Sequence, residues 1–232
     1  IPEVVEVTDV ESKEKITRPD KLYDLTTLQR ECNKYFGYSA KQTLDYAQSL
    51  YEKKLITYPR TDSRYLTDDM GRTVEKYVDS FGDDKDEKNF KSLFDSSKVT
   101  DHHAIIPTMQ SLHFNTGTLQ KSEEKVFELI KVKLLAARSG NLVTENTKVT
   151  VEVEGHKFIA TGMVVADPGY TKYLTSFVKK KEDKLLPKVE KGENLEVNKK
   201  SIKEKYTKPP KPYTEDSLLK AMEIAGSKDI GD

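Results

Sequence analysis

Polar and apolar positions along the chain follow two different periods. Residues 1–8 alternate weakly, which predicts a short strand, and the polar stretch ESKEKITRPDK is expected to connect this strand to a helical region. Between about residues 25 and 140 the apolar positions repeat at helical spacing. The period then returns to two in TKVTVEVEGHKFIATGMVV, which predicts a hairpin with Glu154 and Gly155 at its turn. This order indicates a helical segment inserted into a β-rich domain.

Sequence signals at helix ends support this interpretation. Thr26 and Gln29 are spaced as a capping box, and Gly37 is a suitable stop for the same helix. Ser39 and Gln42 repeat the box for the next helix, which ends shortly before the stretch LITYPRTDSRYL. The strongest amphipathic pattern is QKSEEKVFELIKVKLLAAR, further along the chain.

The predicted fold class is therefore mixed α+β, with three regions. Residues 1–24 and 141–206 are assigned to one discontinuous β-rich domain, in which ENLEVNKKSIKEKY forms a late strand. Residues 25–140 are the inserted, mainly helical domain. Residues 207–232 hold the proline-rich linker TKPPKPY and a final helix capped by Thr214, which begins a further domain.

Composition narrows the class of protein. Lys+Arg and Asp+Glu both number 39, so the net charge is zero, which argues against a general DNA-coating protein but not against a local basic groove. No apolar run reaches the roughly 18–20 residues that span a bilayer, so we expect a soluble protein without a membrane partner. The single cysteine, Cys32, excludes an intrachain disulfide and fits a reducing cytoplasm. Both chain ends look cut, and we expect a fragment.

Tyr58 and Arg60 form the first candidate site. A tyrosine hydroxyl can attack phosphorus if a nearby cation stabilises the developing negative charge, and the planar fork of arginine matches phosphate oxygens. The same spacing also arises by chance in a chain with 12 tyrosines and 39 basic residues. From the residues alone, Tyr58 is either a nucleophile or an ordinary loop tyrosine.

The stretch DHHAIIPT, with His102 and His103, is the second candidate. Adjacent histidines could be a metal pair, a donor to phosphate or part of a structural turn. Metal binding is the weakest of these, because neighbouring side chains of an extended strand face opposite ways and no third ligand has suitable spacing. Gln48 and Glu52 share a helix face, which either points at a nucleic-acid strand or is solvated.

Together, these sequence motifs resemble those of a known family. LYEKKLITYPRTDSRYL and DHHAIIPT closely resemble the type IA DNA topoisomerases, particularly the topoisomerase III branch. The segment YDLTTLQRECNKYFGYSAKQTLDYAQSLYE resembles the lead-in to the active tyrosine of that family, and PPKPYTEDSLLKAMEIAG is similar to the segment that returns to its main body. The resemblance covers about residues 20–225 in the same order.

The resemblance implies specific roles. Tyr58 would be the nucleophile that breaks one DNA strand and holds its 5′ end as a phosphotyrosine, before strand passage relaxes or decatenates the DNA. Arg60 would bind the scissile phosphate and stabilise the pentacovalent transition state, and His102 matches the active-site histidine of the family. A DNA-binding face would be formed by Gln48, Glu52, Thr57, Thr61, Asp62, Arg64 and His103.

The resemblance also implies an architecture and partners. The β-rich domain would be an arch that carries the tyrosine-bearing domain, and DNA, mainly single-stranded, would be the partner, with no small-molecule substrate. The catalytic acids and the Mg²⁺ site of the family lie in an N-terminal Toprim domain, whose motifs this sequence lacks. We therefore expect no metal site in this chain, no catalysis by the chain alone, and a cytoplasmic, DNA-associated location for the parent enzyme.

Two other classes of protein stay open on the sequence. In a non-catalytic module that binds single-stranded nucleic acid, Tyr58 would stack on a base. In a purely structural or interaction domain, Arg60 and His102 would lie far apart and the chain would bind no DNA.

Overall fold

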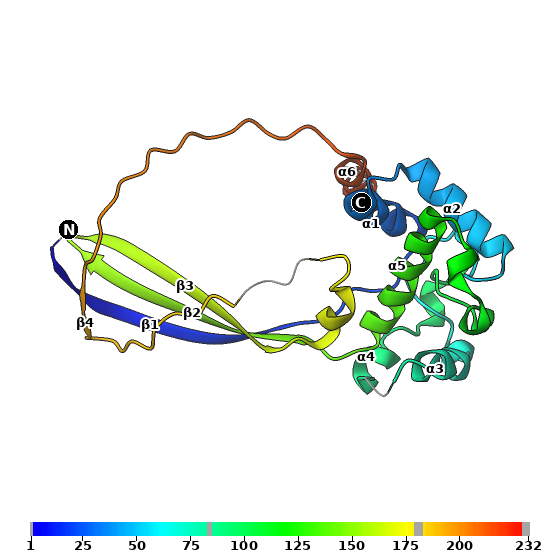
Figure 1. Cartoon of the computed structure of the whole chain (residues 1–232), viewed down its shortest axis with the longest axis horizontal. Helices are drawn as coiled ribbons and strands as arrows, with labels where there is room; N and C mark the ends of the chain where they lie inside the picture. Colours follow the sequence, from blue (N-terminus) through cyan, green and yellow to red (C-terminus); the bar gives the residue numbers. More distant parts are fainter. Residues whose placement is uncertain (1, 83–84, 179–182, 229–232) are drawn as a thin grey trace. The chain divides into compact units, whose positions relative to one another are not determined.

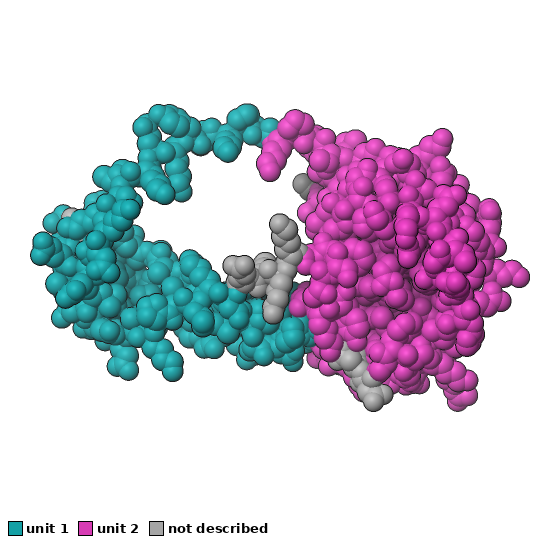
Figure 2. Space-filling view, in the orientation of Figure 1, with its two compact units in different colours: residues 1–18, 141–169, 179–210 teal, residues 19–140, 170–178, 211–232 magenta. Residues whose placement is uncertain are grey.

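A computed structural model of the chain describes residues 2–82, 85–178 and 183–228. It contains both helices and strands, which confirms the predicted mixed fold class. The chain divides into two compact units, shown in different colours in Figure 2. The first unit comprises residues 1–18, 141–169 and 179–210, and the second comprises residues 19–140, 170–178 and 211–232.

The first unit is built on an antiparallel sheet with the strand order β3-β2-β1-β4. The long strand β1 (Val4–Thr17) pairs with β2 (Leu142–Val153), and β2 pairs with β3 (His156–Asp167), so that three strands form an extended ribbon (Figure 1). The short strand β4 (Asn194–Glu196) pairs with the start of β1.

The turn between β2 and β3 is the predicted one. Glu154 and Gly155 have φ values of 50° and 76°, both in the left-handed region. Two-residue hairpin turns in which both residues have positive φ match the twist of the flanking strands. The sequence therefore identifies this hairpin and its turn correctly.

Two strand predictions are wrong in extent. The strand predicted over residues 1–8 continues to Thr17, so ESKEKITRPDK is largely strand and not a connection. The predicted late strand shrinks to Asn194–Glu196. Most side chains of β1 are exposed or half-buried, because the ribbon is held by backbone pairing more than by burial. The apolar alternation that reveals a half-buried strand is therefore absent.

Gly162 in β3 lies directly under a later segment of the chain. The backbone N–H of Met163 donates to the carbonyl of Lys184 (3.0 Å), and the N–H of Lys184 donates back to Met163 (3.0 Å). A Cβ atom on Gly162 would lie 2.8 Å from the Lys184 carbonyl oxygen and 2.9 Å from Cγ of Leu186. Only glycine therefore permits this close approach.

We predict that Gly162→Ala detaches this segment. The added methyl group meets a backbone atom that has no free rotation, and such overpacking costs about 1–3 kcal/mol. Amide hydrogen exchange at Met163 and Lys184 measures the effect, and both amides should exchange faster. Gly140→Ala is the matched control, because a Cβ there meets nothing within 4 Å. Unchanged exchange in Gly162→Ala would contradict the prediction.

The second unit is helical and packs around α5 (Lys121–Ala137) (Figure 1). Its other helices are α1 (Leu25–Phe36), α2 (Ala40–Glu52), α3 (Gly71–Asp79), α4 (Glu87–Lys91) and α6 (Glu215–Lys228). Short 3₁₀ turns occur at η1 (Asp68–Met70), η2 (Ser96–Lys98), η3 (Met109–His113), η4 (Thr116–Thr118) and η5 (Gly169–Leu174).

Two hydrophobic clusters share α5. Ile130 of α5 is buried in the cluster formed with α1 and α2, whereas Leu134 is buried in the cluster formed with α3 and α4. The extended segment at residues 104–106 also contributes to both, since Ile105 belongs to the first cluster and Ile106 to the second. This segment therefore lies on the seam of the helical core.

The start of α1 differs from the prediction. The cap is Asp24 and not Thr26, because the Asp24 carboxylate accepts the backbone N–H of Thr27 at 2.7 Å, which rules out the predicted box with Gln29. An aspartate two residues earlier satisfies the same free N–H groups at the helix start. The predicted stop is confirmed, since Gly37 is left-handed with φ 71°.

Two other predicted caps, Ser39 and Thr214, are confirmed. The Ser39 hydroxyl accepts the N–H of Gln42 at 3.1 Å, and the Gln42 side chain accepts the N–H of Ser39 at 2.9 Å. At the start of α6, the Thr214 hydroxyl accepts the N–H of Ser217 at 3.2 Å. Local residue pattern is thus sufficient to place α2 and the beginning of α6.

Candidate functional site

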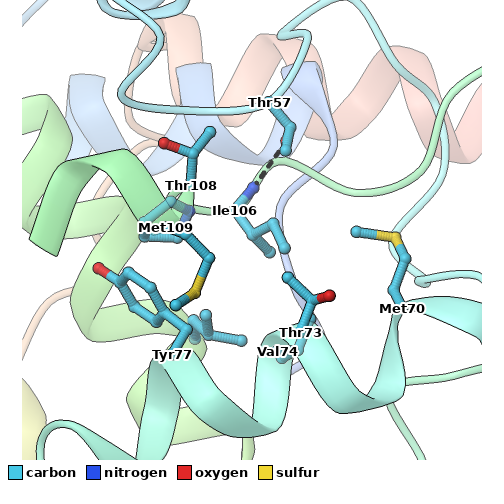
Figure 3. Close-up of a pocket in the computed structure, with 10 residues that line it drawn as sticks. Thr57, Met70, Thr73, Val74, Tyr77, Ile106, Thr108 and Met109 are labelled. Carbon is cyan, nitrogen blue, oxygen red and sulfur yellow. Dashed lines mark hydrogen bonds between the residues drawn. The ribbon is translucent and has the colours of Figure 1, made fainter.

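Two short extended segments lie side by side and position Tyr58. The backbone N–H of Thr57 donates to the carbonyl of Ile106 (2.9 Å), and the N–H of Ile106 donates to the Thr57 hydroxyl (3.0 Å; Figure 3). This hydroxyl in turn donates to the carbonyl of Ala104 (3.1 Å). Thr57 therefore ties the backbone next to Tyr58 to the DHHAIIPT segment.

Tyr58 and His102 are in contact, although they are far apart in the sequence. Their ring centroids are 4.5 Å apart with an interplanar angle of 52°. His102 is exposed and Tyr58 is half-buried. The Thr61 hydroxyl donates to the His102 carbonyl at 2.7 Å and fixes the histidine backbone beside the tyrosine loop. The structure thus brings together two of the three residues predicted to be catalytic.

Tyr51 is a neighbour of Tyr58 that the sequence did not reveal. The rings of Tyr51 and Tyr58 meet edge to face, with centroids 5.3 Å apart and an interplanar angle of 73°. The chain reverses after α2 because Lys54 adopts a left-handed conformation with φ 61°. In the sequence Tyr51 reads as one more member of the α2 helix face, and no local signal indicates that the chain doubles back onto it.

Arg60 lies on the exposed side of the same loop. Pro59 and Thr61 on either side are buried, so the backbone around Arg60 is anchored while its side chain is in solvent. Within the described part of the chain, Arg60 forms no hydrogen bond or ion pair. Its guanidinium fork is therefore free to bind an anion.

Three of the residues predicted to face DNA lie on the surface near this loop. The Gln48 amide donates to a carboxylate oxygen of Glu52 at 3.0 Å, which confirms that the two share one face of α2. Asp62 is exposed, and its carboxylate accepts the hydroxyl of Thr100 at 3.3 Å. These side chains remain open to solvent on at least one side.

Arg64 and His103 make contacts within the protein. Nε of Arg64 donates to the carbonyl of Leu22 at 3.0 Å, and Nη2 donates to the carbonyl of Lys21 at 3.4 Å. Nδ1 of His103 donates to the carbonyl of Ala104 at 2.8 Å. Both residues therefore hold the backbone around the site.

A buried carboxylate fixes the helix that leads to Tyr58. Glu123 of α5 is 3% exposed, and the Ser49 hydroxyl and the Lys53 ammonium group of α2 both donate to its Oε1 atom at 2.5 Å. The backbone N–H of Gln120 donates to Oε2 at 3.2 Å. Burial alone would raise the pKa of Glu123, but these hydrogen bonds outweigh it and leave the pKa below its usual value.

We predict that Glu123→Gln lowers the free energy of unfolding by about 1–3 kcal/mol at neutral pH, because Lys53 loses its anionic partner. Since the pKa of Glu123 is lower in the folded than in the unfolded chain, this contribution is present above pH 4.5, the usual value, and disappears as the pH falls through the folded value. Urea unfolding at neutral and acid pH measures the difference from the unmodified chain.

The matched control for this experiment is Glu124→Gln, which removes an exposed ion pair with Lys121 and should change stability little. The difference between Glu123→Gln and the unmodified chain should shrink at acid pH. A difference that is equal at both pH values would contradict the assignment of stability to the ionised Glu123.

An apolar cavity of about 180 Å³ lies behind the Thr57–Ile106 pair (Figure 3). Its wall is almost entirely carbon and methionine sulfur, so it offers little to a charged ligand. A phosphate would bind on the exposed Tyr58 side and not in this cavity. The lining residues are Thr57, Met70, Thr73, Val74, Tyr77, Ile106, Pro107, Thr108, Met109 and Leu134.

In the described ranges, no group of three or more His, Cys, Asp and Glu side chains is arranged to hold a metal ion. These residues therefore do not fit a magnesium site, and we assign no step to a metal held by them. No helix in the part of the chain that the structure covers is long and apolar enough to cross a bilayer.

The side chains at this surface suit the chemistry of a phosphodiester. A phenol oxygen can act as a nucleophile, an imidazole beside it can donate a hydrogen bond, and a free guanidinium can hold two phosphate oxygens. Tyr58, His102 and Arg60 can supply these three groups from one loop and the segment packed against it.

Comparison with known proteins identifies the class. The family described as DNA topoisomerase matches residues 2–231, nearly the whole chain. The chain also resembles a crystal structure of full-length topoisomerase I from Thermotoga maritima, with a TM-score of 0.75 and 26% sequence identity over 97% of this chain and 38% of that one. The chain therefore belongs to the DNA topoisomerase family.

Curated relatives place it within that family. It is 38% identical to DNA topoisomerase 3 of Bacillus licheniformis over 234 aligned positions, and 37% identical to DNA topoisomerase 3 of Bacillus subtilis. It is thus homologous to the topoisomerase III branch of the type IA enzymes, as the sequence motifs predict. Each match covers 94% of this chain but 32% of the relative, so the chain spans about a third of their length.

Proposed function

We propose that this chain is the tyrosine-bearing part of a type IA DNA topoisomerase, and that Tyr58 attacks a phosphodiester of single-stranded DNA. The observation that carries the proposal is the contact between Tyr58 and His102, whose ring centroids are 4.5 Å apart. Their two motifs are separate in the sequence, and a merely structural tyrosine would not require this neighbour. In this proposal the complete enzyme works on DNA in the cytoplasm, and relaxes or decatenates it by strand passage.

The proposed step exchanges one phosphodiester for another. Oη of Tyr58 forms a bond to phosphorus while the bond from phosphorus to the 3′ oxygen breaks. The tyrosine loses its proton, and the departing 3′ oxygen takes one up. The 5′ end of the cut strand is then held as a phosphotyrosine, and attack by the 3′ hydroxyl reverses the step and reseals the strand.

Arg60 and His102 support this step in different ways. The guanidinium of Arg60 binds the two non-bridging phosphate oxygens, whose charge increases in the transition state. The imidazole of His102 donates to the same phosphate and confines the Tyr58 ring on one side. Tyr51 confines it on another, so the hydroxyl is positioned before DNA binds.

The rest of the active site lies outside this chain in our proposal. A Toprim domain supplies the acid that protonates the 3′ oxygen, and it holds Mg²⁺, which assists at the phosphates when bound. The chain alone is therefore expected to bind DNA without cutting it, since losing a general acid commonly slows a reaction by about 10²–10⁴-fold.

The test is a chimera in which these 232 residues replace the matching segment of the Bacillus subtilis relative. An oligonucleotide labelled at its 3′ end is mixed with the chimera, and the reaction is stopped with detergent. The label should become covalently attached to the protein, and mass spectrometry of the peptides should place it on Tyr58. The isolated chain, run in parallel, should give no adduct.

Other outcomes discriminate between the alternatives. Transfer of a 5′ label would contradict the proposed polarity, and an adduct on another residue would contradict the role of Tyr58. DNA binding by the chimera without any adduct would favour the non-catalytic module in which Tyr58 stacks on a base.

A further inference from the structure

Two lysine ammonium groups converge on the side chain of Tyr65. Nζ of Lys21 donates a hydrogen bond to the Tyr65 hydroxyl and lies 4.4 Å from the centre of its ring. Nζ of Lys98 lies 4.7 Å from the same ring centre. Both lysines are exposed and Tyr65 is half-buried, so the cluster is accessible to a ligand.

Positive charge exceeds negative charge in this cluster. Asp95 forms an ion pair with Lys98 at 2.6 Å, whereas Lys21 has no ion-pair partner among the described residues. Arg64 adds a third cation and donates to the backbone carbonyl of Lys21 at 3.4 Å, which holds Lys21 beside Tyr65. Three cationic side chains thus accompany one carboxylate in a chain whose total charge is zero.

The cluster is attached to the same backbone segment as the Tyr58 site. The N–H of Ala104 donates to the carbonyl of Tyr65 at 2.9 Å, and the carbonyl of His102 accepts the hydroxyl of Thr61 at 2.7 Å. Residues 102–104 are therefore hydrogen-bonded to the loop that carries both Tyr58 and Tyr65. The Tyr58 site and the cluster thus share one loop and one supporting segment.

We propose that Lys21, Tyr65 and Lys98 form a second phosphate-binding site, which holds a neighbouring phosphodiester of the strand that lies at Tyr58. The identity of the ligand as DNA rests on the proposed function. The two ammonium groups, which both contact the Tyr65 ring, can each donate to one non-bridging oxygen. This site positions the strand and carries no sequence information.

The chemistry of Tyr65 supports the proposal. The hydrogen bond from Lys21, together with the charges of Lys21 and Lys98, lowers the pKa of the Tyr65 hydroxyl despite partial burial. The same positive field acts on any anion that approaches this oxygen. A structural role explains the cluster less well, because exposed ion pairs and surface lysines contribute little to stability.

The test measures the salt dependence of binding. A fluorescent single-stranded oligonucleotide is titrated with the 232-residue chain at several salt concentrations, and log K is plotted against log[salt]. The double variant Lys21→Gln/Lys98→Gln should bind more weakly, with a slope reduced by about 0.7, the value for one phosphate of a single strand. Lys121→Gln, which removes an exposed lysine of α5, is the matched control and should leave the slope unchanged.

A modified oligonucleotide locates the contact. Replacing single phosphates in turn by uncharged methylphosphonates should reveal one linkage whose neutralisation weakens binding to the unmodified chain but not to the double variant. An abasic linker at the adjacent nucleotide should leave the effect intact, because the proposed contact is to phosphate and not to a base.

Several results would overturn the proposal. These are an unchanged slope in the double variant, equal losses for every methylphosphonate in both proteins, or no binding of DNA by the chain at low salt. None of these results would affect the adduct expected on Tyr58 in the chimera. Conversely, a changed slope without an adduct would retain the phosphate site and reject the proposed cleavage.

Discussion

Tyr58→Phe in the chimera with the Bacillus subtilis relative is expected to abolish covalent attachment to DNA. The substitution removes one oxygen atom and leaves the ring that contacts Tyr51 and His102. Adduct formation should fall by about three orders of magnitude or more, as when the nucleophile of another covalent enzyme is removed. Detergent-stopped reactions with a 3′-labelled oligonucleotide measure the adduct.

DNA binding separates this chemical effect from a structural one. The Kd of the Tyr58→Phe chimera for the same oligonucleotide should stay close to that of the unmodified chimera, because the aromatic surface is retained. Tyr206→Phe, at a tyrosine that is 79% exposed, serves as the control and should form adduct normally. Normal adduct formation by Tyr58→Phe would remove Tyr58 from the mechanism.

Arg60→Ala is expected to slow cleavage by about 100- to 1,000-fold, the range seen when one group that stabilises transition-state charge is removed. The side chain is exposed, so the variant should fold normally. Arg60→Lys should recover only part of the rate, because an ammonium group cannot hold two phosphate oxygens in a planar fork. Single-turnover cleavage rates at saturating DNA measure both effects.

Arg72→Ala provides the comparison for charge alone, since Arg72 is an exposed arginine of α3. It should cleave at the unmodified rate. Equal slowing of cleavage in Arg60→Ala and Arg72→Ala would show that the loss of any positive charge has this effect. The proposed binding of the scissile phosphate by Arg60 would then be wrong.

Local sequence signals predict the helical part of this protein well. The Ser39–Gln42 box is present as predicted, and Val126 and Ile130 of the strongest amphipathic pattern are fully buried in α5. These features depend on neighbours within one or two helical turns, so a short stretch of sequence is enough to predict them. The displaced cap at Asp24 is a small error of the same local kind.

The extent of β1 could not be predicted, because it depends on a distant partner. Glu11 to Lys15 look like a polar linker, but this stretch pairs residue by residue with positions 144–148 of β2. When both faces of a ribbon are exposed, backbone pairing between strands does not require apolar and polar residues to alternate in the sequence.

The candidate site, like the fold, depends partly on contacts between residues that are far apart in the sequence. Resemblance to a family names Tyr58, Arg60 and His102, but spacing alone could not bring Tyr58 and His102 into contact. The edge-to-face contact of Tyr51 depends on the left-handed Lys54, a conformation that non-glycine residues seldom adopt and that sequence rarely signals.

The position of residues 104–106 on the seam of the helical core has a consequence for cooperativity. Ile105 and Ile106 belong to different hydrophobic clusters, and α5 supplies buried side chains to both. We therefore expect a displacement of this segment to weaken both clusters, because each one buries side chains of the segment and of α5. A substitution in either cluster should then also loosen the contact between Tyr58 and His102, since the segment that follows His102 is anchored in both clusters.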